Sequence, residues 1–147
     1  MTTMTDTLNK LVETTENGKR GFAEGAEKLS KDGHAAMAAT FAELSRQRAT
    51  FASELRALDP ALVDAQESDG SVAGVIHRSW MALKDALNGN DPHGVLDAAE
   101  QGEDHAVKEF SAALEGGLPD AARPVVARQY AAIKASHDKI KALRDQD

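Results

Sequence analysis

The chain of 147 residues contains no cysteine, one tryptophan and one tyrosine. Without cysteine it can form no disulfide, no thiolate metal site and no cysteine nucleophile. No apolar run approaches the roughly 20 residues that cross a bilayer, so we expect no transmembrane helix. The N-terminus shows no basic segment followed by an apolar one, so we expect no secretory signal. Together these absences predict a cytoplasmic protein.

Positive charge is also scarce, because 17 Lys and Arg residues face 24 Asp and Glu residues, for a net charge of −7. This surplus of negative charge argues against binding to the phosphate backbone of nucleic acids. No predicted helix has the basic polar face that binds membrane surfaces. We therefore expect neither a nucleic-acid nor a membrane partner.

β-Branched residues are few: valine and isoleucine together number 11, against 27 alanines. Alanine leads the helix scale and β-branched residues favour sheets, so this balance predicts an all-α protein. No alternating apolar–polar run is flanked by hairpin turns. A length of 147 residues fits a single domain over 1–147.

Turn residues divide the chain into five segments whose apolar side chains recur every three or four residues. Helices are predicted over about 5–31, 34–58 and 71–87, from Asp91-Pro92 onward, and from near Arg123 to the C-terminus, with Pro124 either starting or bending the last helix. Tight turns join the first two long helices and the last two, which gives two antiparallel αα-hairpins. The long crossover between them, about 59–90, contains the short helix. This is the ferritin-like four-helix-bundle topology.

One stretch carries a recognisable pattern: residues 69–87 around Trp80, with 47–55 before it, 102–104 after it, and 129–130 and 137–138 near the C-terminus. Together these segments resemble the small bacterial ferritin-like family of four-helix-bundle proteins known as a domain of unknown function. The resemblance covers nearly the whole chain. It implies a ferritin-like bundle with a helical crossover in a bacterial, cytoplasmic setting, and it implies no settled biochemical function.

A ferritin-like bundle suggests a dinuclear metal centre, which needs a Glu from each of two helices and a Glu-x-x-His from each of the other two. The candidate ligands for Fe, Mn or Zn are Glu16, Glu43, Glu100, Glu103 and His137. However, Glu43 is followed three residues later by Arg46, and the residue three before His137 is Lys134. Both Glu-x-x-His pairs therefore carry a cation at a ligand position, which weighs against a conventional dimetal centre.

The competing interpretation is a structural polar layer inside the bundle. Arg48 lies on the apolar stripe of its helix, and an unpaired charge there would cost several kcal/mol. We expect Arg48 to pair with Glu16 or Glu103, with Tyr130 donating a hydrogen bond. Such a layer would fix the register of the helices.

Two classes of function stay open at this point. The first is a non-enzymatic bundle that needs no cofactor and acts through its surface or its assembly, in a stress response or as a homo-oligomer that pairs through helix faces. The second is a carboxylate/histidine metal-binding or small-ligand-binding bundle. Nothing in the sequence resembles a nucleophile elbow, a P-loop or a dinucleotide-binding fingerprint, so the balance favours a protein that is not an enzyme.

Overall fold

A computed structural model describes residues 4–58, 92–116 and 118–145 of the chain. These residues form four α-helices and no strand: α1 (Met4–Lys31), α2 (Ala35–Ala57), α4 (Pro92–Glu115) and α5 (Arg123–Asp145). The prediction of an all-α protein is confirmed, and the observed helix bounds lie close to the predicted ones. The short helix predicted over 71–87, with its Trp80, and the crossover around it lie outside the described residues. None of the described helices is long and apolar enough to cross a membrane.

The turn between α1 and α2 ends the first helix sharply. Gly33 adopts a positive φ of 87°, which a residue without Cβ reaches at no steric cost. The backbone N–H of His34 donates to the carbonyl of Leu29 at 2.8 Å, and that of Gly33 donates to Ser30 at 3.2 Å. This pair of hydrogen bonds is a Schellman motif, which satisfies carbonyls that the helix end would leave free. The chain can therefore reverse direction within three residues.

Prolines mark the starts of the second pair of helices. Pro92 is the first residue of α4, where its fixed φ suits the helix and its missing N–H removes no hydrogen bond. Pro124 is the second residue of α5, so it too lies in the first turn, where N–H groups have no partner within the helix. Of the two alternatives that the sequence left open, α5 therefore begins at Arg123 and is not bent at Pro124.

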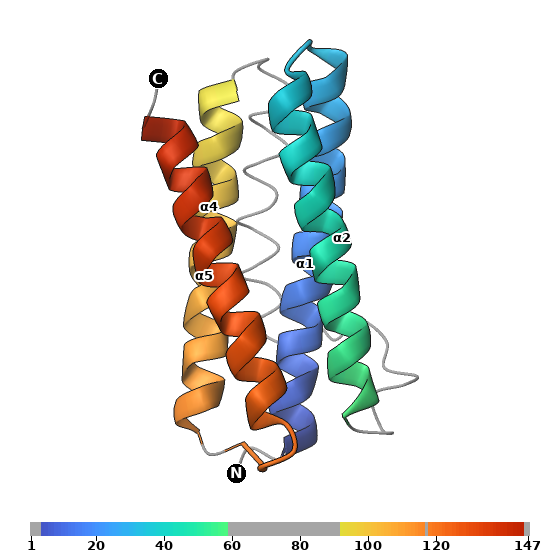
Figure 1. Cartoon of the computed structure of the whole chain (residues 1–147), viewed down its shortest axis with the longest axis vertical. Coiled ribbons are helices and arrows are strands. Elements are labelled where there is room, and N and C mark those ends of the chain that lie inside the picture. The colour runs from blue at the N-terminus through green and yellow to red at the C-terminus, as the bar shows by residue number, and fades with distance from the viewer. Residues whose placement is uncertain (1–3, 59–91, 117, 146–147) are drawn as a thin grey trace.

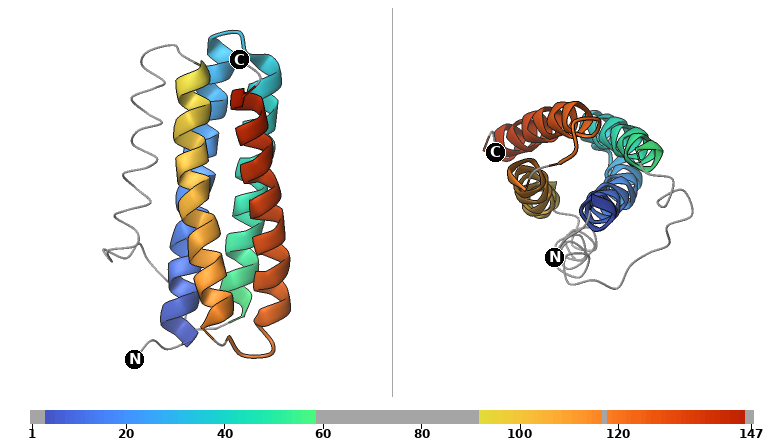
Figure 2. Two further views of the ribbon diagram at one scale, coloured as in Figure 1. Left: turned by 90° about the vertical axis from the view of Figure 1, so that its left-hand side faces the viewer. Right: turned by 90° about the horizontal axis from the view of Figure 1, so that it is seen from below.

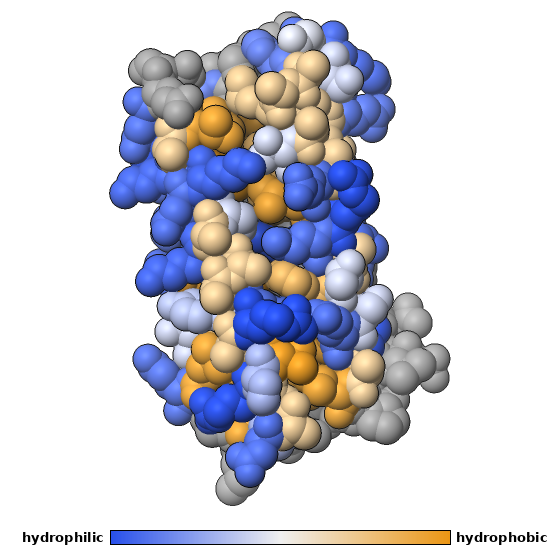
Figure 3. Space-filling view, in the orientation of Figure 1, coloured by the Kyte–Doolittle hydropathy of each residue, from blue (hydrophilic) through white to orange (hydrophobic). Residues whose placement is uncertain are grey.

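The four helices stand at the corners of an elongated bundle. Figure 1 shows α1 and α5 running upward, and α2 and α4 running downward. α1 packs against α2 and α4, and α5 packs against α4 and α2, with the α2–α5 contact the least extensive of the four. Viewed along its length in Figure 2, the bundle places α2 diagonally opposite α4. Over the least extensive contact, Figure 3 shows apolar side chains between α5 and α2, bordered by hydrophilic ones.

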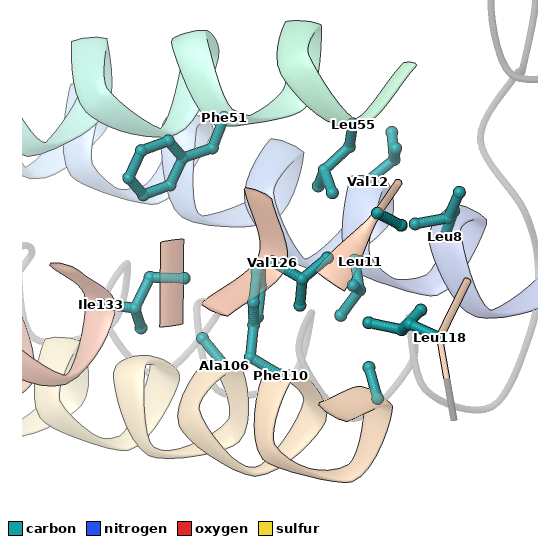
Figure 4. Packing of buried hydrophobic residues seen from close by; sticks show 12 residues of the cluster. Leu8, Leu11, Val12, Phe51, Leu55, Ala106, Phe110, Leu118, Val126 and Ile133 are labelled. Atoms are coloured by element: carbon teal, nitrogen blue, oxygen red, sulfur yellow. The ribbon is translucent and has the colours of Figure 1, made fainter. Parts of the chain in front are cut away.

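The core is built from positions that recur alternately every three and four residues, the spacing of left-handed helix packing. In α1 this series includes Leu8, Leu11, Phe22 and Leu29, all buried as predicted. One cluster lies near the α1–α2 turn, where Phe22 and Phe41 meet edge to face with ring centroids 5.2 Å apart. The second cluster, shown in Figure 4, fills the other end of the bundle. Its larger members are Leu8, Leu11, Val12, Phe51, Leu55, Phe110, Leu118, Val126 and Ile133.

Candidate functional site

A polar layer occupies the middle of the bundle, between the two apolar clusters. Each helix contributes one residue to it: Gly18 from α1, Arg48 from α2, Glu103 from α4 and Ser136 from α5. Arg48 is 1% exposed, Glu103 0% and Ser136 5%. Because α2 and α4 are diagonal neighbours, the Arg48–Glu103 pair reaches across the bundle axis from one hairpin to the other.

The guanidinium of Arg48 donates two parallel hydrogen bonds to the Glu103 carboxylate. Nη1 donates to Oε1 at 2.5 Å and Nη2 donates to Oε2 at 2.7 Å. The same Nη2 donates to Oγ of Ser136 at 2.8 Å, and Nε donates to Oε1 of Gln47 at 3.1 Å. Bidentate geometry of this kind is the strongest form of an arginine–carboxylate pair. Every nitrogen of the buried guanidinium therefore has an acceptor.

Ser136 completes the layer as both acceptor and donor. Its Oγ lies 2.6 Å from Oε2 of Glu103 and 2.8 Å from the carbonyl oxygen of Ile133. A hydroxyl has one proton, and the charged carboxylate is the nearer acceptor, so the proton belongs on the Glu103 side. The buried carboxylate is thus held by three hydrogen bonds.

Room for the large guanidinium comes from α1. A Cβ placed on Gly18 would lie 3.3 Å from Nη1 of Arg48 and 3.5 Å from its Cγ. The guanidinium carbon also lies 5.4 Å from the centroid of the Phe22 ring, within cation–π range. The layer therefore depends on a glycine and an aromatic ring one turn apart on the same helix.

Glu16, the other carboxylate considered for Arg48, lies elsewhere. Its carboxylate pairs with Arg56 of α2 at 3.2 Å and with Lys19 at 3.0 Å. Burial raises the pKa of Glu16, but the pairs with Lys19 and Arg56 outweigh this effect and hold the pKa below its usual value. Glu16 thus links α1 to α2 and does not reach the central layer.

The structure brings two of the remaining candidate ligands, Glu100 and His137, together between α4 and α5, and it places Glu43 apart from them. Glu43 is exposed on the outside of α2. Glu100 of α4 forms a salt bridge with Arg144 of α5. His137 lies beside it: Nε2 is 3.8 Å from Glu100 and 3.2 Å from Oδ1 of Asp104. Despite these short distances, buried Nε2 has no hydrogen-bond partner among the described residues. Within the described ranges, no three His, Asp or Glu side chains are grouped to hold a metal ion.

Tyr130 does not join the layer, and Ser136 takes the place that the sequence interpretation gave it. The buried positions of α5 are Val126, Gln129, Ile133, Ser136 and Ile140, whereas Tyr130 and His137 are only partly buried. Tyr130 is partly buried and packs against the second apolar cluster, the one that contains Phe51 and Phe110. The two series differ by one residue at alternate turns, a rotation of about 100° that moves a side chain from the axis to the helix flank.

Gln129 is a second polar residue that sequence reasoning missed. Its side chain is fully buried, and Nε2 donates to Oε1 of Glu54 at 3.0 Å and to the carbonyl of Phe51 at 3.3 Å. Glu54 in turn accepts from Arg128 at 2.9 Å. Gln129, Arg128 and Glu54 therefore tie α5 to α2 where these two helices meet. Gln129 and Ser136 lie seven residues apart on one face of α5, but Tyr130 and His137 have the same spacing, so the sequence of α5 alone holds no signal that singles out the buried pair.

A matching family model, described as Domain of unknown function (DUF2383), covers residues 3–116. No curated protein and no solved structure matches the chain.

Proposed function

The chain belongs to this family, and from its geometry we propose that it is a ferritin-like bundle that acts through its surface or assembly, without a metal and without catalysing a reaction. The observation that carries the proposal is the Arg48–Glu103 pair. A buried cation already neutralises the central carboxylate from both of its oxygens.

The course of the chain supports the ferritin-like part of the proposal. α2 and α4 run in the same direction, so the end of α2 and the start of α4 lie at opposite ends of the bundle. One long crossover between two antiparallel hairpins is the arrangement of ferritin-like folds.

The dimetal centre that this topology suggests does not fit the residues present. Such a centre gathers four carboxylates and two imidazoles at mid-bundle. Here the mid-bundle position of α2 holds Arg48, Glu16 is engaged by two cations, and Glu43 is exposed. A divalent ion bound to Glu103 would lie in contact with the Arg48 guanidinium. Two positive charges in contact repel strongly where water is excluded. The donor set therefore supports a structural layer.

The test is the metal content of protein purified without chelator. We expect Fe, Mn and Zn to be far below one ion per chain, and far-UV circular dichroism to stay strongly helical after exhaustive chelation. The rival metal-binding function instead requires a stoichiometric ion that His137→Ala removes and that the surface control Glu24→Gln retains. That result would overturn the proposal.

A further inference from the structure

The exposed residues of α2 form one stripe along the helix. They recur alternately every three and four residues, so they stay on the side opposite the buried series that includes Phe41, Arg48 and Leu55. The members that matter below are Ala36, Ala39, Glu43, Arg46, Thr50 and Ser53.

Most side chains of this stripe are short. The hydroxyl of Thr50 already donates to the carbonyl of Arg46 at 3.2 Å, so contact with another helix would leave no unpaired hydroxyl there. Short side chains allow two helices to approach to about 8 Å. The outer face of α1 is different, because it carries exposed Lys10, Glu24 and Lys31, whose longer charged side chains keep a neighbour at a distance.

Two opposite charges stand at the middle of the stripe. Glu43 and Arg46 are both exposed, and neither forms an ion pair with another described residue. If a second α2 lies antiparallel, with Glu43 facing Arg46 of the second copy, two-fold symmetry creates the same pair twice. The same register places Ala39 opposite Thr50 and Ala36 opposite Ser53. The stripe is therefore complementary to itself in both charge and size.

We propose that α2 is a self-association face, and that two copies of this chain pair through antiparallel α2 helices about a two-fold axis between Glu43 and Arg46. A closed two-fold contact of this kind uses one surface on both subunits. The inference names the partner for the assembly proposed above and rests on that proposal.

The test is a charge swap followed by sedimentation equilibrium across a concentration series. Glu43→Arg and Arg46→Glu each put like charges at both contacts, so each variant alone should dimerise at least about tenfold more weakly than wild type. Mixing the two variants restores both pairs, and so does the double variant Glu43→Arg/Arg46→Glu. Both should recover the wild-type dissociation constant. Glu24→Arg, an exposed change on α1, is the matched control and should have no effect.

Circular dichroism of each variant establishes that the bundle is folded, since both substituted side chains are exposed. The inference is overturned if wild type stays monomeric up to a protein concentration of about 1 mM. It is also overturned if the single variants dimerise like wild type, or if the mixture and the double variant fail to recover. None of these outcomes touches the metal-free proposal, which is tested separately by metal content and by metal addition.

Discussion

Two of the arginine–carboxylate pairs among the described residues join the two hairpins of this bundle, and they differ mainly in where they lie. Arg48 and Glu103 link α2 to α4 at the centre and are almost wholly buried, whereas Arg128 and Glu54 link α5 to α2 at the surface, with side chains 55% and 34% exposed. Water and salt screen the outer pair, so it contributes little. The inner pair is unscreened, and neither partner can be removed without leaving an unpaired charge in the core. The same chemistry is therefore a structural requirement in one place and an accessory in the other.

The largest expected effect separates the two pairs directly. Arg48→Ala leaves Glu103 buried without its cation and opens a cavity, so the free energy of unfolding should fall by about 3–5 kcal/mol. Arg128→Ala removes the same side chain from an exposed pair and should cost only about 0–1 kcal/mol. Urea unfolding of both variants measures the contrast. Equal losses would mean that burial does not distinguish the pairs.

A second variant tests whether Arg48 needs the space that the absent side chain of Gly18 leaves on α1. Gly18→Leu places a large side chain where even a Cβ would lie 3.3 Å from Arg48, and crowding of this kind should cost about 1–3 kcal/mol. In an Arg48→Ala background the same leucine fills vacated space, so its cost should shrink or reverse. Chemical denaturation of the four proteins in this cycle gives the coupling. An identical cost in both backgrounds would show that Gly18 and Arg48 act independently.

Ser136 should matter less than either charged partner. Ser136→Ala removes a hydrogen bond to Glu103 and one from Arg48, while the bidentate pair remains, so we expect a loss of about 1 kcal/mol. Ser30→Ala, at an exposed position of α1, is the matched control and should stay within about 0.5 kcal/mol of wild type. A Ser136→Ala protein as stable as the control would remove serine from the layer.

The smallest effect concerns Glu16, whose pairs are near the surface. Its pKa is lowered in the folded state from an ordinary value of 4.5, so its contribution to stability is present above that pH and is lost as the pH falls through the lowered folded-state pKa. Glu16→Gln should therefore be a few tenths of a kcal/mol less stable than wild type at pH 7. The difference should shrink as the pH falls from 4.5 through the lowered pKa. Thermal unfolding across this range measures it, and a gap that widened on acidification would contradict the sign.

The helices and most of their buried faces could be predicted from the sequence, because strong apolar periodicity, Gly33, Pro92 and Pro124 all mark them locally. The expectation that Arg48 pairs inside the bundle followed from its place among apolar neighbours. Its alternative partner, Glu16, came within two residues of Gly18, which actually faces Arg48. The sequence therefore predicted, to within two residues, which part of α1 lies level with Arg48 along the bundle.

The register of α5 could not be read with the same accuracy. Val126, Ile133 and Ile140 fit two series equally well, one through Tyr130 and His137 and the other through Gln129 and Ser136. The first series looks more like a core because its side chains are larger. The second is buried because the axis already holds a guanidinium and a carboxylate, which need a small hydroxyl partner and leave no room for a ring. Only the neighbouring helices supply that information.

The central claim is that the buried Arg48 guanidinium neutralises Glu103 at the centre of the bundle, so the bundle needs no metal ion. Thermal unfolding of chelated wild-type protein, with and without Fe(II), Mn(II) or Zn(II), tests it most directly, because any ion that binds the folded state raises the melting temperature by mass action. We predict no rise beyond about 1 °C for any of the three ions, in wild type or in His137→Ala. A rise of several degrees in wild type that His137→Ala abolishes would contradict the claim.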